Sequence, residues 1–209
     1  MTHILITGFT PFDGRSQNAS WIAAKSLCLA HGTDHIAHCL RIPVRWAEPQ
    51  KQITLAVQRW QPRIIISMGE GKPGQFTLES LARNTRKERQ DNDGRLPHGA
   101  PIDPQGEAER HSSAPLASIA NTLKTNGVRV TCSTDAGAFL CEELLYCLEG
   151  VRASNSSVEL VLLAHLPPFG TPLEYRGATR HCDPALLLDF SQNLLAAGLQ
   201  HLPKAIAQS

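Results

Sequence analysis

The sequence lacks the features that mark membrane and nucleic-acid-binding proteins. Its longest apolar runs, such as residues 64–66 and 160–163, are far shorter than the roughly 20 residues that span a bilayer. The 20 Lys+Arg and 19 Asp+Glu residues leave a net charge of +1, with no basic block that could bind phosphates. We therefore expect neither a membrane nor a nucleic acid as a partner.

Signals for export, disulfide pairing and cofactor binding are also missing. The first residues contain no basic segment followed by an apolar stretch of signal-peptide length, so we expect a cytoplasmic protein. The 6 cysteines include no Cys-x-x-Cys pair, which is typical of reduced thiols. Residues 8–14 carry neither a G-x-G-x-x-G motif nor the Lys-Ser/Thr of a P-loop, so no nucleotide cofactor is expected.

Metal binding is also not expected. His31, His35 and His38 have a spacing that could present three ligands on one helix. Gly32 and the strand-like residues that follow disfavour a stable helix there. We therefore predict no metal site.

Alternating strand-like and helix-like segments predict an α/β fold. The 209 residues, 42% hydrophobic, are enough to bury a core, and no linker divides them, so we expect a single domain over residues 1–209. The expected strands are 3–7, 37–42, 63–68, 128–133 and 159–165, and the expected helices are 21–30, 48–61, 115–126, 140–148 and 184–197. This order implies a twisted, mostly parallel sheet with helices on both faces. In such sheets the chemistry lies at the carboxyl ends of the strands. Residues 83–111 fit neither pattern and are expected to form a long loop, which is usually functional or mobile.

Three reactive side chains follow different predicted strands. Cys141 begins a predicted helix, where the helix dipole favours a thiolate, although a free cysteine is more often an inert core residue. His165 ends a buried strand before two prolines, although a histidine in such a place is more often a core residue. Glu79 follows the third strand and its glycine-bearing turn, although a lone Glu is usually a solvated charge. Together they match the nucleophile, base and orienting carboxylate of an acyl-transfer triad.

Four segments resemble the pyroglutamyl peptidase I family of cysteine peptidases. Residues 8–14 (GFTPFDG) and 18–20 (NAS) resemble the family's G-F-x-P-F-G-G and N-P-S. Residues 79–84 (ESLARN) resemble E-R-x-A-x-N, and residues 133–141 (STDAGAFLC) resemble S-x-x-A-G-x-[YF]-[VL]-C. Residues 164–167 (AHLP) resemble I-H-[VI]-P. The matches occur in the family's order along most of the chain.

The resemblance implies a function and a role for each matched residue. Cys141 is the expected nucleophile, His165 the acid-base and Glu79 its orienting partner, while Arg89 is expected to help stabilise the oxyanion. Phe9 and Phe12 are expected to pack on a lactam ring, and the pocket is expected to include Asn18, Gly69 and Glu70. The expected substrates are peptides with an N-terminal pyroglutamate, and no cofactor is needed. The resemblance also implies homodimers or homotetramers.

The chain departs from the family pattern in the expected pocket. Residues 69–74 read GEGKPG where the family usually has G-x-A-G-G-R, with an uncharged polar residue at the second position. Unless it is protonated or paired with Lys72, Glu70 would place a bare charge against a neutral lactam. Asp13 replaces the second glycine of the first motif, and Glu142 replaces the usual Asn after the nucleophile. Two alternatives stay open: an altered relative that binds a small molecule or peptide, and a thiol amidase for another small acyl group.

Overall fold

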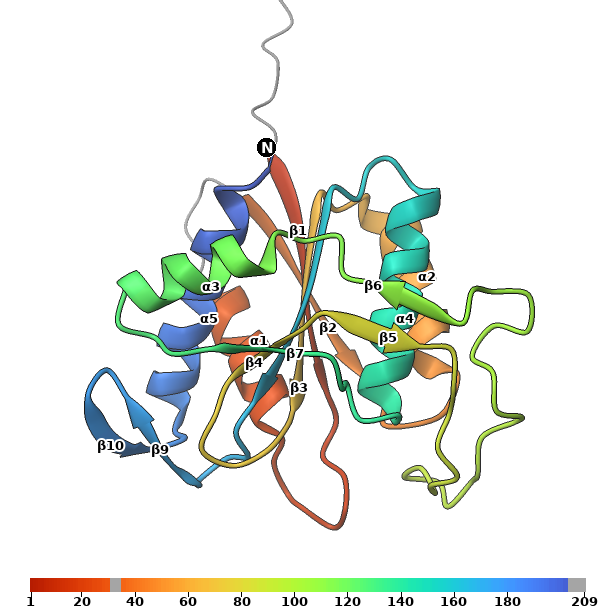
Figure 1. The fold of residues 1–209 in the computed structure, drawn as a ribbon, viewed down its shortest axis with the longest axis horizontal. Helices are drawn as coiled ribbons and strands as arrows, with labels where there is room; N and C mark the ends of the chain where they lie inside the picture. Colours follow the sequence, from red (N-terminus) through yellow and green to blue (C-terminus); the bar gives the residue numbers. More distant parts are fainter. Residues whose placement is uncertain (31–34, 203–209) are drawn as a thin grey trace, which may run out of the picture.

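A six-stranded sheet lies at the centre of the molecule, between two groups of helices (Figure 1). The computed structural model describes residues 1–30 and 35–202. The sheet order is β2 (His35–Ile42), β1 (Thr2–Phe9), β3 (Ile64–Glu70), β8 (Leu160–Leu166), β4 (Thr77–Glu79) and β7 (Thr131–Ser133). The first four strands run parallel, whereas β4 runs antiparallel to β8 and parallel to β7. The sheet therefore has a long parallel part and a short part of reversed direction.

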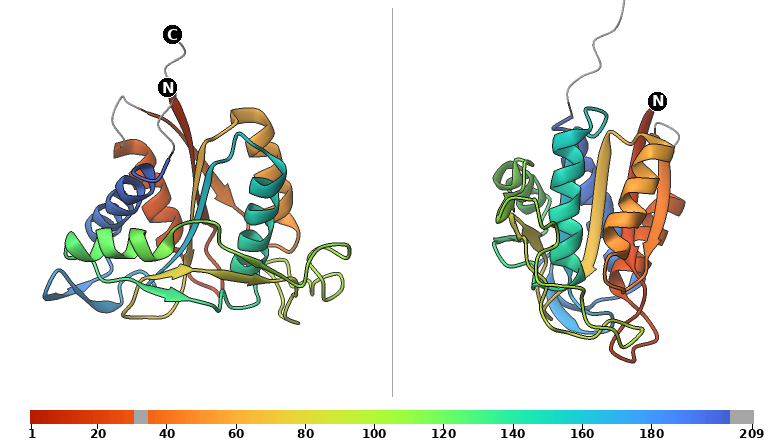
Figure 2. Two further views of the ribbon diagram at one scale, coloured as in Figure 1. Left: turned by 45° about the horizontal axis from the view of Figure 1, so that its top comes forward. Right: turned by 90° about the vertical axis from the view of Figure 1, so that its right-hand side faces the viewer.

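Each face of the sheet packs against its own helices, as the two views in Figure 2 show. One face is covered by α1 (Ala19–Ala30), α3 (Leu116–Thr125) and α5 (Pro184–Leu199), and the other by α2 (Glu48–Trp60) and α4 (Leu140–Ser154). Neighbouring strand residues point to opposite faces, so Ile4 joins the first core and Leu5 the second. Both are fully buried. Burial on both faces explains why the central strands β1, β3 and β8 are mostly apolar in sequence.

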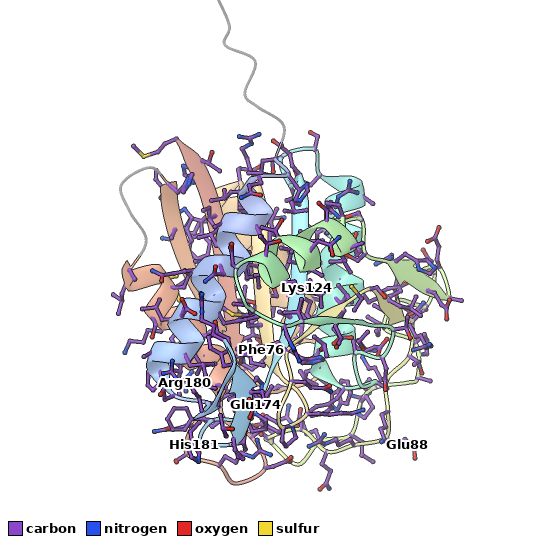
Figure 3. All side chains as sticks on the ribbon, turned by 60° about the vertical axis from the view of Figure 1, so that its left-hand side comes forward. Phe76, Glu88, Lys124, Glu174, Arg180 and His181 are labelled. Carbon is purple, nitrogen blue, oxygen red and sulfur yellow. The ribbon has the colours of Figure 1, made fainter. Side chains whose placement is uncertain are left out.

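Two small sheets complete the fold. β5 (Leu81–Arg83) pairs with β6 (Glu109–His111), and β9 (Pro172–Tyr175) forms a hairpin with β10 (Ala178–His181). Figure 3 labels Glu174, Arg180 and His181 on this hairpin, at the lower edge of the molecule in that view. Strands of three or four residues are too short for hydrophobic periodicity, which explains why the sequence did not predict β4, β5, β6, β9 or β10.

The predicted α/β class and its alternating order are confirmed. The fourth predicted strand begins at Thr131 rather than Val128, and α4 continues to Ser154 rather than ending at Leu148.

Gly150 lies within α4 and does not end it. A β-carbon at Gly150 would lie only 2.3 Å from Nη1 of Arg110. In this position glycine lets another segment approach the helix closely.

Two sequence interpretations concern metals and membranes. His31 of the histidine spacing lies outside the described residues. Within residues 1–30 and 35–202, no group of three or more His, Cys, Asp or Glu side chains is arranged to hold a metal ion. No helix in these ranges is both long and apolar enough to cross a bilayer.

Candidate active site

A cavity of about 410 Å³ opens where the parallel strands end. Its wall includes Phe9 from the end of β1, Glu70 from the end of β3 and His165 near the end of β8. The other predicted site residues in the wall are Phe12, Asn18, Glu79, Arg89 and Cys141. The fold therefore brings residues from five separate sequence segments to one cavity, at the edge of the sheet that the sequence predicted.

Cys141 lies in the first turn of α4, which begins at Leu140. Ala138 (φ 53°) and Gly137 (φ 93°) form a tight left-handed turn immediately before the helix. The N-cap residue Phe139 has no side-chain hydrogen bond to the helix end. Because the first N–H groups of a helix have no partner within the helix, the backbone next to Cys141 can donate hydrogen bonds to a developing oxyanion.

His165 and Glu79 form a buried pair on adjacent strands. In the antiparallel register of β4 and β8, His165 lies opposite Thr77. Nδ1 of His165 is 2.8 Å from Oε1 of Glu79, and the Thr77 hydroxyl donates a hydrogen bond to the same oxygen. Both members of the pair are buried, with 9% of His165 and 1% of Glu79 exposed. Glu79 follows the β3 turn, as the sequence indicated, and it ends a short strand, β4, that the sequence did not predict.

The remaining nitrogen of His165 faces Cys141. The imidazole is hydrogen-bonded to Glu79, and the nearby Cys141 thiol raises its pKa. Gly69 lies against both groups, since a β-carbon on Gly69 would be 2.5 Å from Sγ of Cys141 and 3.4 Å from Nε2 of His165. Any side chain at position 69 would therefore displace the thiol or the imidazole. Gly69 thus lies behind the reactive atoms rather than in the cavity wall.

The electrostatics of the site favour a charged imidazole. Burial lowers the pKa of His165, but the Cys141 and Glu79 side chains outweigh this effect and raise it to about 10. Burial raises the pKa of Glu79, but hydrogen bonds to His165, Ser133 and Thr77 hold it below its usual value. An imidazolium next to a cysteine favours the nucleophilic thiolate. The three side chains can therefore act as nucleophile, acid-base and orienting carboxylate.

Arg89 lies at the rim of the cavity, held by a residue that departs from the family pattern. Its Nη2 is 2.7 Å from Oδ2 of Asp13, and its guanidinium lies 4.3 Å from the ring centroid of Phe139 and 5.8 Å from that of Phe12. These contacts fix the cation over two aromatic rings. The expected oxyanion role of Arg89 stays a prediction.

Asn18 contributes to the wall mainly as a support. Its Oδ1 accepts hydrogen bonds from the backbone N–H (3.0 Å) and the hydroxyl (2.7 Å) of Ser20 at the start of α1. Its Nδ2 donates to the carbonyl of Thr10 at 3.0 Å. Because both polar atoms already have partners, Asn18 shapes the loop that carries Phe12.

The charge of Glu70 is paired, but with Arg15 rather than with Lys72. Its Oε2 is 2.6 Å from Nη1 of Arg15, and its Oε1 accepts a 2.7 Å hydrogen bond from the backbone N–H of Ala19. Across the described part of the chain, Lys72 forms no ion pair with it. The sequence could not reveal this pairing, because Arg15 and Glu70 are separated by 55 positions.

Glu142 has a structural role that the sequence did not indicate. Its carboxylate accepts hydrogen bonds from the backbone N–H groups of Arg83 (2.5 Å) and Ala138 (2.9 Å). It is 1% exposed. Glu142 therefore ties the turn before Cys141 to β5.

The sequence analysis also did not identify Thr77 and Ser133, which hydrogen-bond to Glu79. The Thr77-x-Glu79 spacing, which places both side chains on one face of a strand, could have indicated Thr77.

Three comparisons with known proteins agree on one family. The profile described as pyroglutamyl peptidase matches residues 2–199. The chain is 33% identical to the pyrrolidone-carboxylate peptidase of Klebsiella pneumoniae over 152 residues, 71% of this chain and 70% of that one. It is 35% identical to the pyrrolidone-carboxylate peptidase of Bacillus subtilis over 147 residues, covering 69% and 68% of the two chains.

Solved structures share the fold along nearly the whole chain. Pyroglutamyl peptidase I from Bacillus amyloliquefaciens superposes with a TM-score of 0.80 at 26% identity, covering 95% of this chain and 93% of the other. A mutant pyrrolidone carboxyl peptidase from Pyrococcus furiosus superposes with a TM-score of 0.85 at 21% identity, covering 97% and 100%. At 21% identity, the similarity to the Pyrococcus furiosus structure supports the fold alone.

Proposed function

The chain belongs to the pyroglutamyl peptidase family and is a hydrolase of the cysteine-peptidase class, and we propose that it releases N-terminal pyroglutamate from peptides through Cys141, His165 and Glu79. One observation carries the assignment of these residues. The Cys141 thiol and the His165 imidazole both lie next to Gly69, the imidazole is hydrogen-bonded to the Glu79 carboxylate, and all three side chains line one cavity.

The reaction follows from this order of groups. The Cys141 thiolate attacks the pyroglutamyl carbonyl, and N–H groups at the start of α4 stabilise the oxyanion. Nε2–H of His165 protonates the departing peptide amine as the C–N bond breaks, which leaves a thioester on Cys141. His165 then removes a proton from water, which attacks the thioester and releases 5-oxoproline and the thiolate. Glu79 orients the ring and stabilises the imidazolium, as the carboxylate does in other triads.

The shape of the cavity suits a small ring. Phe9, Phe12 and Phe139 supply flat apolar walls close to the nucleophile. A lactam also carries an N–H and a C=O that need hydrogen-bond partners once they are buried. A proline ring lacks the carbonyl, so a site that satisfies both lactam groups should discriminate strongly against proline.

Release of the chromophore from pyroglutamyl and prolyl arylamides tests the proposal. With a thiol reductant present, the wild-type chain should cleave the pyroglutamyl compound, and Cys141→Ala should not. Cys132→Ala is the matched control, because Cys132 is exposed and absent from the cavity wall, and it should retain full activity. Cleavage by Cys141→Ala would overturn the assigned nucleophile. Cleavage of a different acyl arylamide in preference would instead support a thiol amidase.

Location and assembly are further parts of the proposal. We place the enzyme in the cytoplasm, where reducing conditions keep a catalytic thiol free. We also propose that it forms the homodimers or homotetramers implied by the family resemblance. Cell fractionation and light scattering of the purified chain measure these properties directly.

A further inference from the structure

An ion pair of unusual placement lies in the wall of the proposed acyl pocket. The side chain of Glu70 is 2% exposed, whereas that of Arg15, its partner at 2.6 Å, is 45% exposed. Arg15 comes from the loop before α1, and Glu70 ends β3. The carboxylate is thus buried at the cavity, while its counter-charge reaches it from the solvent side.

Arg15 also touches the aromatic wall of the same pocket. Its guanidinium lies 5.2 Å from the ring centroid of Phe12, within the range of a cation–π contact. Arg89 approaches the same ring at 5.8 Å, so two cations hold Phe12. Arg15 therefore affects the pocket in two ways, because it neutralises one wall residue and positions another.

Neutralisation matters because of the two rings that the pocket has to distinguish. Pyroglutamyl and prolyl groups have the same ring size, but the lactam is uncharged and the prolyl amine is mostly protonated at neutral pH. A buried, unpaired carboxylate would be costly beside a neutral lactam and would attract a cation. Whether the Glu70 carboxylate is paired or unpaired therefore affects which of the two substrates the pocket prefers.

We propose that Arg15 is a positioning residue that neutralises Glu70 and thereby sets the preference of the pocket for a neutral lactam over a cationic pyrrolidine. This inference rests on the proposed function, since it concerns the selectivity of the same cavity. It differs from a simple packing role because it depends on the charge at position 15 and on the charge at position 70 together. Removing Arg15 leaves the charge of Glu70 without its counter-charge beside the substrate, whereas removing both charges leaves this part of the wall uncharged.

A double-mutant cycle measures this dependence. For Arg15→Met, kcat/KM for pyroglutamyl arylamide should fall by about tenfold or more, and the ratio of pyroglutamyl to prolyl cleavage should fall with it. Arg15→Met combined with Glu70→Gln should recover most of the ratio. Arg15→Lys keeps the charge and should stay near the wild-type ratio. Arg59→Met removes an arginine from the last turn of α2, outside the cavity wall, and should change nothing.

A binding readout separates this inference from the proposed function. Pyroglutamide, a neutral lactam, should protect Cys141 from iodoacetamide in the wild type better than prolinamide does, and Arg15→Met should reverse or abolish that difference. If the wild type protects Cys141 in this way but cleaves no arylamide, the proposed function fails and the inference stands. If the wild type is active and Arg15→Met leaves both the cleavage ratio and the protection unchanged, the inference fails. A double variant that recovers nothing also overturns it, because the effect would then be packing alone.

Discussion

The reactive centre and the rim of the same cavity are built in opposite ways. At the centre, Glu79 and His165 are 1% and 9% exposed and are joined by a 2.8 Å hydrogen bond between strands. At the rim, the side chains of Arg89 and Asp13 are 39% and 54% exposed, and their ion pair lies in water. Buried polar networks lose much when one partner is removed, whereas exposed pairs contribute little. Changes at the centre should therefore abolish the chemistry, and changes at the rim should adjust substrate preference.

Removing the base should give the largest effect. His165→Ala should reduce kcat/KM by about 10³-fold or more, because both the thiolate and the leaving-group proton depend on the imidazole. The double variant with Cys141→Ala should be scarcely worse than either single variant, since groups that act as one unit are not additive. Steady-state kinetics with pyroglutamyl arylamide measure this. Wild-type rates in His165→Ala at neutral pH would refute the triad.

Adding one methyl group at Gly69, next to the reactive atoms, should give the second-largest effect. In Gly69→Ala the new β-carbon would lie 2.5 Å from Sγ of Cys141, so the thiol has to move. A displacement of this kind should reduce kcat by about a hundredfold, because reacting atoms tolerate little misplacement. Gly74→Asn is the control, since a β-carbon at Gly74 would meet nothing within 4 Å and Asn tolerates its φ of 79°. Equal losses in both variants, at equal thermal stability, would contradict the proximity argument.

Loss of the orienting carboxylate should be milder and should change the pH profile. Activity needs protonated His165, so it should decline as pH rises through about 10, the raised pKa of that residue. Glu79→Gln removes a charge that raises this pKa, so the alkaline limb should move to lower pH while some turnover survives. Rate–pH profiles of both proteins measure the shift. An alkaline limb at the same pH in both would show that Glu79 does not stabilise the imidazolium.

The same pKa makes a prediction about stability. The pKa of His165 is raised from 6.5 in a free side chain to about 10 in the fold. The stabilisation from its protonated ring is therefore present in full below pH 6.5 and is lost as pH rises through about 10. Thermal unfolding should show a decline in Tm over this window that is absent from His165→Ala. A parallel decline in both proteins would assign it to other groups.

The rim should show the smallest effect. Asp13→Asn breaks the exposed pair with Arg89, and such pairs contribute up to about 1 kcal/mol. We expect a change of a few fold, in KM rather than kcat, which fades at high salt because exposed charges are screened. Measuring KM at low and high ionic strength tests this. A large loss in kcat would indicate that Arg89 acts in the chemical step rather than only at the rim, and it would support the predicted oxyanion role of Arg89.

Much of the fold could be read from the sequence, because its signals are local. The buried strands are apolar runs, and the helix signals, such as Asp183 before α5, lie within one or two turns of the element they start. Oδ1 of Asp183 does accept a hydrogen bond from Leu186 N–H at 2.8 Å, as an N-cap should. The family resemblance is likewise confirmed by the profile over residues 2–199. The roles of Cys141, His165 and Glu79 remain predictions that the geometry supports.

The short strands and the charge pairing of the site could not be read in this way. The place of Glu79 after the β3 turn was predicted, but the strand β4 that pairs with β8 was not, because three residues carry too little periodicity to be recognised. The partner considered for Glu70 was Lys72, but Arg15 reaches it from a separate loop. Glu142 looked like an unexplained replacement, yet its carboxylate holds the turn before the nucleophile.

By itself, the sequence predicted the order of the long strands and helices, the edge of the sheet where the cavity lies and most of the side chains that line it. These depend on hydrophobic periodicity, on helix-start signals and on short motifs, all of which act over a few neighbouring residues. Only the tertiary structure decided which charges are paired, which glycine lies behind the thiol and how β4 brings Glu79 to His165. Those contacts join residues far apart in the chain, and their energies depend on distance and burial, which only the folded chain has.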